Sequence, residues 1–373
     1  MPPSGFSLCA GDAGMKIGIF GGTFNPPHRG HLSAAHAAVK ALELDLLYVI
    51  PTGRPPHKDT VQTVPADVRY RLAQLAFAGL ANARVSDLEI CRAGFSFTID
   101  TILALREQHP NADLYLLLGT DMFLSIETWR RVSDLLAMIT PVVFARRQGE
   151  NDIVQRQMGH IKEIYGVSAV QIAHAALDIS SGALREMLPN RQGTDFLGAH
   201  VYREIIRRRL YGAQMDFVWL REQVCAWLPP KRVQHVLDTG STAAHLAAHW
   251  GADIDLAREA ALLHDITKGL SYCEQLHICE KYDMIPNGVE KIIHAETGAA
   301  IARAEFGVCD AVHDAVRYHT VGRENMTLLE QIVYVADYIE PGRDFPGVED
   351  MRRAAYSDLN EAVRMKRELP KDK

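Results

Sequence analysis

Several features that mark other protein classes are missing from this sequence of 373 residues. No apolar run approaches the roughly eighteen residues that a membrane-spanning helix requires. The six cysteines form no C-x-x-C pair and no zinc-knuckle spacing, so we expect buried thiols in a reducing compartment. A net charge of -6 argues against a broad basic surface that covers nucleic-acid phosphates. We therefore expect a cytoplasmic protein that binds neither membranes nor nucleic acids.

The composition is that of a globular protein, with 47% hydrophobic and 23% charged residues, and the length suggests two domains. The first fourteen residues lack the basic segment and the long apolar core of a signal peptide, so we place the structural start at Met15.

Short apolar segments alternate with helical patterns from residue 15 to about residue 211. Strands are expected at 16–20, 46–50, 113–118 and 141–145, and helices at 30–42, 67–80 and 97–108. Strand, helix and strand in succession indicate βαβ units. The sequence therefore predicts a Rossmann-like α/β domain over residues 15–211, with a parallel sheet covered by helices on both faces.

The pattern changes beyond a helix expected at 201–210. Almost no strand-like alternation follows, and amphipathic helices are expected at 216–228, 231–249, 253–268, 271–282, 289–305, 308–318 and 325–339. We predict an all-α domain over residues 216–373 and a domain boundary near 211–216.

A candidate phosphate site lies where the first strand passes into the first helix. The segment reads Gly21-Gly22-Thr23-Phe24-Asn25-Pro26-Pro27-His28-Arg29-Gly30-His31. Unpaired backbone amides at a helix N-terminus favour an anion, and glycines let a phosphate approach the main chain. His28 and His31 are three residues apart, so both rings can lie on one side of the first turn and donate N–H groups to phosphate oxygens.

This segment resembles the G-G-T-F-x-P-x-H-x-G-H signature of the T/H-x-G-H nucleotidyltransferases, and most closely the bacterial nicotinate-nucleotide adenylyltransferases. Three further segments carry the resemblance: Pro51–Lys58, Leu118-Gly119-Thr120-Asp121 with Trp129, and Ile179–Arg185. The last is similar to the family's I-S-S-T-x-I-R motif, with Gly182 in place of the usual threonine. We expect this departure to weaken phosphate binding at most.

The resemblance implies transfer of an adenylyl group from ATP to nicotinate mononucleotide, with Mg²⁺ bridging the polyphosphate. The implied catalytic residues are His28, His31, Lys58 and Arg185. The implied nucleotide-binding residues are Gly21, Gly22, Thr23, Phe24, Gly119, Asp121, Trp129, Ser180 and Ser181.

Two of these residues, and Arg147 nearby, also have other interpretations. Asp121 suits a helix N-cap after Gly119-Thr120, and Trp129 suits packing in the core. Arg147 follows a strand and suits a solvated surface as well as a substrate-facing position.

Histidines and aspartates recur through the predicted helical domain in the order His235, His264-Asp265, His294, His319 and Asp337. A carboxylate at the end of an otherwise apolar helix, as at Asp265, is costly unless it is paired or bound to metal. Neutral imidazole and carboxylate together suit iron, manganese, zinc or nickel.

This order resembles the HD phosphohydrolase superfamily, and more closely the small bacterial HD proteins that cleave diadenosine tetraphosphate symmetrically. By resemblance His235, His264, Asp265 and Asp337 would hold the metal, iron or another transition metal such as manganese. His294 and His319, with Thr320 beside them, would complete a second metal site or bind phosphate. Lys268 and Arg343 would neutralise the leaving diphosphate.

The sequence thus predicts a bifunctional enzyme whose ligands are ATP, nicotinate mononucleotide and diadenosine tetraphosphate. Two alternatives stay open for the C-terminal half. It could act on nucleoside mono- or triphosphates, or it could be a regulatory or oligomerisation module with a vestigial site, and a homo-oligomer is possible.

Overall fold

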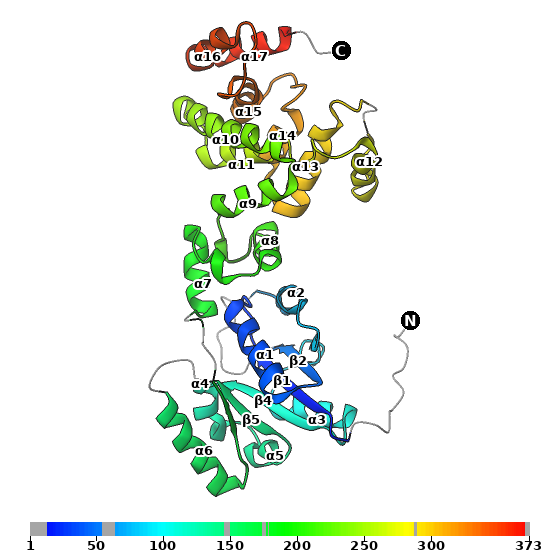
Figure 1. The fold of residues 1–373 in the computed structure, drawn as a ribbon, viewed down its shortest axis with the longest axis vertical. Coiled ribbons are helices and arrows are strands. Elements are labelled where there is room, and N and C mark those ends of the chain that lie inside the picture. The colour runs from blue at the N-terminus through cyan, green and yellow to red at the C-terminus, as the bar shows by residue number, and fades with distance from the viewer. Residues whose placement is uncertain are drawn as a thin grey trace. The chain divides into compact units, whose positions relative to one another are not determined.

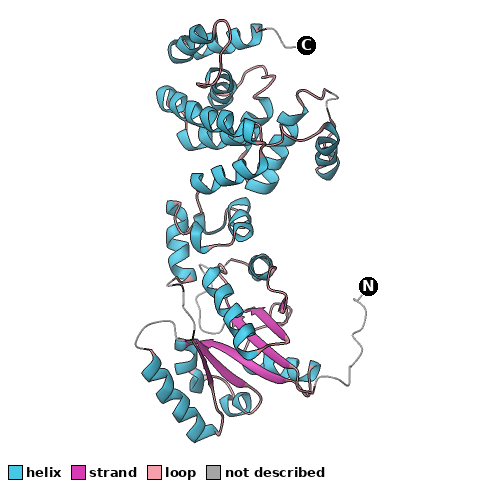
Figure 2. Cartoon of the chain, viewed as in Figure 1, coloured by secondary structure: helices cyan, strands magenta, loops and turns pink. Residues whose placement is uncertain are grey.

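The structure is a computed structural model that describes residues 13–53, 64–144, 150–173, 177, 179–286 and 289–369. The chain divides into two compact units, residues 1–202 and residues 203–373. The first contains a sheet with helices on both faces, and the second is helical (Figures 1 and 2). Among the described residues, no helix is long and apolar enough to cross a membrane.

The first unit has a six-stranded sheet in the order β3-β2-β1-β4-β5-β6, and all paired strands are parallel. This is the doubly wound strand order, so the predicted Rossmann-like fold is confirmed. The strands are β1 (Lys16–Gly22), β2 (Leu46–Pro51), β3 (Ala83–Val85), β4 (Asp113–Gly119), β5 (Thr140–Phe144) and β6 (Val170–Ile172).

The two central strands separate at their carboxyl ends. The pairing of β1 with β4 stops at Ile19 and Leu116, whereas β1 pairs with β2 as far as Gly22 and β4 pairs with β5 as far as Gly119. The strand order reverses between β1 and β4, and in such sheets ligands bind beyond the carboxyl ends at this point. The fold therefore places the glycines that end β1 and β4 at the expected ligand crevice.

Alternate side chains of the strands form two cores, one on each face of the sheet. Helices α1 and α2 cover one face, and α3, α4, α5 and α6 cover the other. The helices of this unit are α1 (Arg29–Leu42), α2 (Ala66–Phe77), α3 (Thr98–Gln108), α4 (Thr120–Leu124), α5 (Val132–Leu136), α6 (Asn151–Tyr165) and α7 (Ser181–Met187), with short 3₁₀ turns at Ile126–Thr128, Leu188–Asn190 and Thr194–Phe196. Helix α8 (Ala199–Arg207) contains the division between the units.

The second unit packs α10, α11, α15, α16 and α17 around one core, as predicted for an all-α domain. Helix α10 starts with Pro230 in its first turn and ends at Gly251 in the left-handed conformation, which are common start and stop signals. After a 3₁₀ turn at Leu210–Gly212, the helices are α9 (Phe217–Trp227), α10 (Pro230–Trp250), α11 (Ile254–Leu263), α12 (Tyr272–Lys281), α13 (Ile293–Phe306), α14 (Asp310–Tyr318), α15 (Leu328–Ile339), α16 (Val348–Ser357) and α17 (Leu359–Glu368).

The structure differs from the sequence-based expectations at a few elements. The edge strands β3 and β6 have three residues each, which is too short for alternation to show. Helices α5, α6, α16 and α17 were not predicted. The expectation of buried thiols is wrong for Cys91, Cys225 and Cys273, which are exposed. Helix α11 ends at Leu263, and residues 264–269 form turns, so His264 and Asp265 follow the helix rather than belong to it.

Our predicted boundary at 211–216 remains a prediction about independent folding. A cut at residue 202 would interrupt α8, whereas 213–215 lie between the Leu210–Gly212 turn and Asp216, the N-cap of α9. We expect segments 15–211 and 216–373 each to be soluble and to unfold in one cooperative transition, because each has its own core. Urea titration followed by circular dichroism tests this. Insoluble segments would mean that the cut is misplaced.

Candidate active sites

The loop from β1 to α1 brings the two predicted phosphate-binding histidines together. His28 is the N-cap residue of α1, and its ring centroid lies 3.8 Å from that of His31. The backbone N–H of His28 donates to Nδ1 of His31 over 3.2 Å. Because Nδ1 accepts this bond, a neutral His31 carries its proton on Nε2 and can donate it to an anion.

A glycine and a buried phenylalanine determine where the two histidine rings of this loop lie. A Cβ atom at Gly30 would lie 3.0 Å from the His28 ring, so a larger residue would push the ring away. Phe24 is 1% exposed and belongs to the core beside α1, with its ring centroid 5.1 Å from that of His31. Phe24 therefore supports His31 from the core side.

Residues at the start of α7 attach this helix to the same loop. The Ser181 hydroxyl donates to the Pro26 carbonyl over 2.8 Å, and Arg185 Nη1 donates to the Asn25 carbonyl over 2.8 Å. Ser180 caps α7 by accepting from the Ala183 amide. Nε of Arg185 is buried and has no hydrogen-bond partner among the described residues. The predicted phosphate-binding segment thus also fixes the loop that carries His28.

A buried arginine, which the sequence analysis missed, connects three loops at this end of the sheet. Arg69 on α2 is 2% exposed, and its guanidinium donates to the carbonyls of Thr23 (2.9 Å), Gly53 (3.0 Å) and Val64 (3.2 Å). In the sequence, Arg69 sits in an ordinary helical pattern, and nothing there marks it as buried.

We expect Arg69→Met to lower the free energy of unfolding by roughly 2–4 kcal/mol, because several buried carbonyls lose their donor. Adenylyl transfer should fall as well, since the Thr23 loop loses its anchor. Urea unfolding followed by circular dichroism measures the first effect. Arg71→Met, at an exposed position of the same helix, is the control. Equal unfolding curves for the two variants would show that Arg69 contributes no more than a surface arginine.

The carboxyl end of β4 carries the predicted pyridine-nucleotide residues. Gly119 is the N-cap of α4, and Asp121 is exposed in the first turn of that helix, so the N-cap interpretation of Asp121 is wrong. The Thr120 hydroxyl lies 2.6 Å from Oε2 of Glu150. Trp129 is half-buried against the core on the face of the sheet that α3, α4, α5 and α6 cover, which supports a packing role. Lys58 and Arg147 lie outside the described residues.

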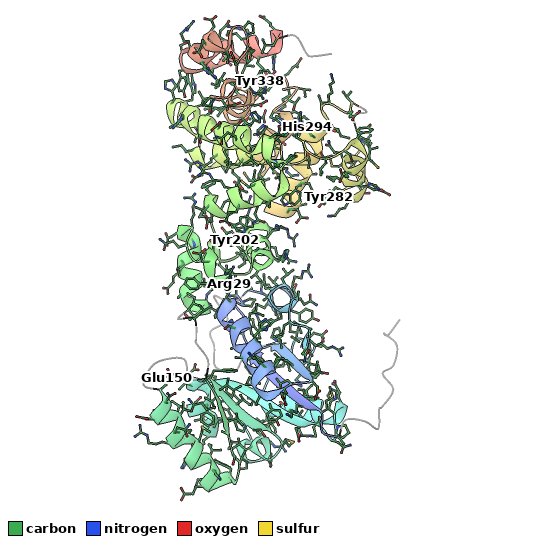
Figure 3. The ribbon with its side chains drawn as sticks, in the orientation of Figure 1. Arg29, Glu150, Tyr202, Tyr282, His294 and Tyr338 are labelled. Atoms are coloured by element: carbon green, nitrogen blue, oxygen red, sulfur yellow. The ribbon has the colours of Figure 1, made fainter. Side chains whose placement is uncertain are left out.

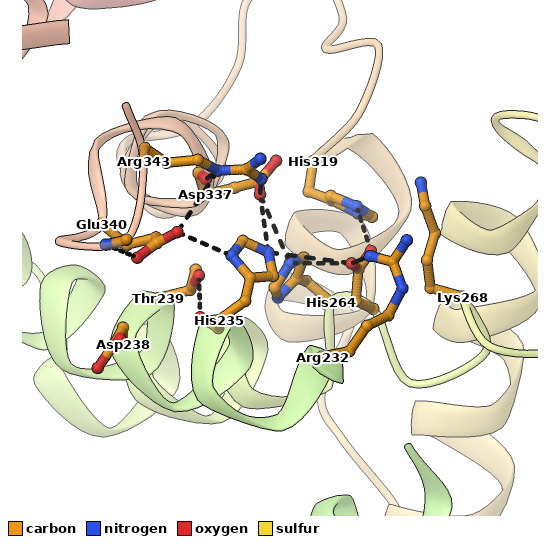
Figure 4. A network of polar contacts seen from close by, with 12 residues as sticks. Arg232, His235, Asp238, Thr239, His264, Lys268, His319, Asp337, Glu340 and Arg343 are labelled. Carbon is orange, nitrogen blue, oxygen red and sulfur yellow. Dashed lines mark hydrogen bonds and ion pairs between the residues drawn. The ribbon is translucent and has the colours of Figure 1, made fainter. Parts of the chain in front are cut away.

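The predicted metal ligands converge inside the helical unit. His235 lies on α10, His294 on α13 and Asp337 on α15, while His264-Asp265 and His319 directly follow α11 and α14. Apart from His235, which is half-buried, each of these side chains is buried. Figure 4 shows His235, His264 and Asp337 pointing toward one another, and Figure 3 places His294 on its helix in this unit.

The distances define two overlapping groups of possible ligands. In the first, Oδ1 of Asp337 lies 3.2 Å from Nε2 of His235 and 3.7 Å from Nε2 of His264. In the second, Oδ2 of Asp265 lies 3.8 Å from Nε2 of His264, and Oδ1 of Asp265 lies 3.5 Å from Nε2 of His319. His294 adjoins the second group, with Nε2 3.3 Å from Oδ1 of Asp265.

The rings of His264 and His319 are hydrogen-bonded to the backbone through Nδ1, so their Nε2 atoms face the centre of the site. Nδ1 of His264 and of His319 each lies 2.6 Å from a backbone carbonyl, that of Ala261 and that of Val316. Since a carbonyl can only accept, each Nδ1 carries the proton and each Nε2 has a lone pair. Burial lowers the pKa of His264 to about 4, so this ring is neutral at pH 7.

These donors fit a divalent transition metal. Nε2 of His264 is buried, has no hydrogen-bond partner in the described part of the chain, and faces the carboxylates of Asp265 and Asp337. Lone pairs that face carboxylate oxygens repel one another unless a cation lies between them. Burial acts to raise the pKa of Asp337, but the ammonium of Lys366 and the guanidinium of Arg343 outweigh it and hold that pKa well below its usual value. The pKa of Asp265 is lowered as well, and its carboxylate pairs with the guanidinium of Arg232, so both carboxylates are charged and available.

Cationic side chains surround the carboxylates. Arg232 Nη1 lies 3.2 Å from Oδ2 of Asp265, and Arg343 Nη2 lies 2.7 Å from Oδ1 of Asp337. Nζ of Lys268 lies 2.9 Å from Nε2 of His294, and Thr320 Oγ1 lies 2.9 Å from Nε2 of His319. Lys268, Thr320 and Arg343 thus lie at the centre, and their roles there remain predictions.

Three residues at this centre had no predicted role, namely Arg232, Glu340 and Lys366. Oε1 of Glu340 accepts a hydrogen bond from Nδ1 of His235 over 3.1 Å, and this contact fixes the orientation of the imidazole ring. Glu340 is three residues after the predicted ligand Asp337, so its position was available as a signal. Lys366 on α17 lies 3.4 Å from Oδ2 of Asp337, and no sequence pattern points to it.

Comparison with known proteins gives one family match for each unit. Residues 19–187 match the cytidylyltransferase-like family, and residues 232–342 match the HD domain. The two matches cover the segments that carry the β1–α1 loop and the histidine–aspartate centre.

Three relatives illustrate what the chain is similar to. A probable nicotinate-nucleotide adenylyltransferase of Clostridium botulinum is 34% identical over 192 residues, which are 52% of this chain and 94% of that protein. A Mycoplasma pneumoniae protein named probable nicotinate-nucleotide adenylyltransferase/Ap4A hydrolase is 27% identical over 327 residues, 87% of this chain and 88% of that protein. A Clostridium acetobutylicum crystal structure, described as an HD superfamily hydrolase involved in NAD metabolism, is 35% identical, has a TM-score of 0.40, and covers 41% of this chain and 84% of its own.

Proposed function

The chain belongs to the nicotinate-nucleotide adenylyltransferase family, and from this premise we propose that it is a bifunctional nucleotide enzyme. Its first unit adenylylates nicotinate mononucleotide with ATP. Its second unit hydrolyses diadenosine tetraphosphate to two molecules of ADP. The fusion of the same two activities is named for the Mycoplasma pneumoniae relative.

The observation that carries the first activity is the His28–His31 pair at the point where the strand order reverses. In the reaction, a phosphate oxygen of the mononucleotide bonds to the α-phosphorus of ATP, and the bond from that phosphorus to the bridging oxygen breaks to release pyrophosphate. The attacking phosphate is already anionic, so no general base is needed. The protein aligns the reactants and neutralises the growing negative charge.

We assign these tasks to residues at the β1–α1 loop. His28 and His31 would donate N–H groups to phosphate oxygens, and Arg185, which already holds the loop, would face the polyphosphate with its remaining nitrogens. Lys58 would bind phosphate by family resemblance. Bound Mg²⁺ would supply further charge neutralisation on the polyphosphate of ATP.

The observation that carries the second activity is the group of buried, lone-pair-bearing Nε2 atoms facing two charged carboxylates. His235, His264, Asp265 and Asp337 would hold a transition metal, iron or manganese, and His294 and His319 would complete a second site or contact phosphate. When bound, such a metal lowers the pKa of water toward neutrality. Hydrolysis adds one water across the central phosphoanhydride bond, which gives two ADP. Lys268 and Arg343 would stabilise the departing diphosphate.

Two alternatives for the helical unit predict different outcomes. Hydrolysis of nucleoside mono- or triphosphates uses the same ligands but gives other products. A non-catalytic module would need no intact centre, yet all predicted ligand positions carry a ligating side chain and meet in one place. This completeness favours an active hydrolase.

One set of assays separates these possibilities. The full chain is incubated with nicotinate mononucleotide, ATP and Mg²⁺, and separately with diadenosine tetraphosphate and Fe²⁺ or Mn²⁺, and products are identified by mass spectrometry. We expect the deamido dinucleotide with pyrophosphate in the first case and ADP alone in the second. AMP with ATP from the second substrate would overturn symmetrical cleavage. Turnover of mono- or triphosphates without cleavage of the tetraphosphate would favour the first alternative.

A further inference from the structure

A lysine on the last described helix reaches the centre of the histidine–aspartate site. The side chain of Lys366 on α17 is 2% exposed. Its Nζ lies 2.6 Å from the carbonyl of Tyr334, 3.0 Å from the carbonyl of His319 and 3.4 Å from Oδ2 of Asp337. Helix α17 therefore contacts the backbone that carries one candidate ligand and the carboxylate of another.

The buried ammonium of Lys366 has a hydrogen-bond acceptor for each of its N–H groups. Its three N–H groups match three oxygen acceptors, and Nζ lies 3.9 Å and 4.0 Å from the ring centroids of Tyr334 and Tyr338, where cation–π attraction adds to the contacts. An ammonium in the interior is retained only where its partners compensate for the lost water.

The two oxygens of Asp337 have different partners. Oδ1 faces Nε2 of His235 at 3.2 Å and Nη2 of Arg343 at 2.7 Å. Oδ2 faces Lys366. Arg343 approaches from the more exposed side, with 37% of its side chain accessible, whereas Lys366 holds the carboxylate from the interior. Rotation of the carboxylate away from the histidines would break the contact with Lys366.

Lys366 also constrains the neighbouring ligand. His319 directly follows α14, and its carbonyl accepts from the same ammonium that contacts Asp337. One cation thus joins the end of α14, the middle of α15 and α17. Since Lys366 is enclosed, it does not reach a substrate, and any effect on the reaction passes through the ligands that it holds.

We propose that Lys366 is a positioning residue of the phosphohydrolase centre, which fixes Asp337 and the His319 backbone so that the metal-facing atoms are arranged before metal binds. This inference rests on the metal-dependent hydrolase activity proposed above. It assigns the C-terminal helix a part in that activity.

The test compares Lys366→Met with Arg364→Met in the full chain. Arg364 lies on the same helix, is 62% exposed and pairs with Glu361, so its loss removes a cation without touching the centre. Mn²⁺ affinity is measured by electron paramagnetic resonance, and urea unfolding followed by circular dichroism reports that the helical unit is folded. We expect Lys366→Met to weaken Mn²⁺ binding about 10–100-fold, the usual effect of losing an outer-layer partner. Arg364→Met should bind Mn²⁺ as the wild type does.

The outcomes are separable. Wild-type Mn²⁺ affinity in Lys366→Met would overturn the positioning role and leave the proposed hydrolase intact. If Lys366→Met does not fold, Lys366→Gln, which keeps two N–H donors without the charge, is measured instead, and wild-type affinity in that variant overturns the role. Absence of Mn²⁺ binding and of tetraphosphate hydrolysis in the wild type would overturn the hydrolase proposal and this inference together.

Discussion

An asparagine at position 265 should abolish the phosphohydrolase activity and sharply reduce bound metal, while adenylyl transfer stays at the wild-type rate. Asp265 is 4% exposed and lies within 4 Å of the Nε2 atoms of His235, His264, His294 and His319. Its carboxylate is the charged group that these four rings share. An amide of the same shape supplies no negative charge, so the histidines would have to retain a dication with Asp337 as the one remaining carboxylate ligand.

Metal analysis and both activity assays on the one variant decide this prediction. Asp238→Asn is the matched control, because Asp238 lies on α10 close to the centre but points away from it and accepts from Gln234. Full metal occupancy in Asp265→Asn would mean that Asp265 has a structural role only. Loss of both activities together would mean that the two sites are coupled, contrary to our expectation of independent sites.

Replacement of His28 by alanine should lower the rate of adenylyl transfer by roughly two to four orders of magnitude, the usual effect of losing one preorganised donor. His28 is 8% exposed, and its ring lies beside that of His31 and close to Gly30. Alanine at this position removes the ring without adding volume, so the fold should persist.

Steady-state kinetics with both substrates measure the effect, and circular dichroism confirms that the variant is folded. His36→Ala is the control, since His36 is exposed two turns further along the same helix. Near-normal turnover of His28→Ala would mean that the assignment of the adenylyl-transfer site to the β1–α1 loop is wrong. A comparable loss in His36→Ala would point to a general defect of helix α1.

The sequence predicted most of the sheet because the central strands are long apolar runs bounded by glycine and proline. Ile17 and Ile19 face one core and Phe20 the other, which is the pattern of a strand buried on both faces. The edge strands could not be predicted, because three residues such as Val170–Ile172 give no periodicity. Helix α11 was predicted too long, because the apolar run does not show that the chain turns after Leu263.

The candidate sites were predictable where short motifs concentrate their residues. His28 and His31 are close in sequence, and His264-Asp265 is a dipeptide. Lys366 and Arg69 could not be predicted, because their importance arises only when distant segments meet. Lys366 contacts Asp337, 29 positions earlier in the chain, and Arg69 contacts Thr23, 46 positions earlier. In the sequence each has the pattern of an ordinary solvated helix residue.

The candidate metal ligands come from successive parts of the helical unit, from His235 on α10 to Asp337 on α15. A form of this unit that has lost α10, α11, α13, α14 or α15 cannot present them together, so a metal that binds them favours the folded state. By mass action such a ligand stabilises the folded state by about 2.7 kcal/mol when its free concentration is one hundred times the dissociation constant. Metal supply would then set the lifetime of the unit against proteolysis as well as its rate of turnover, and scarcity of the metal would reduce the amount of enzyme in the cell.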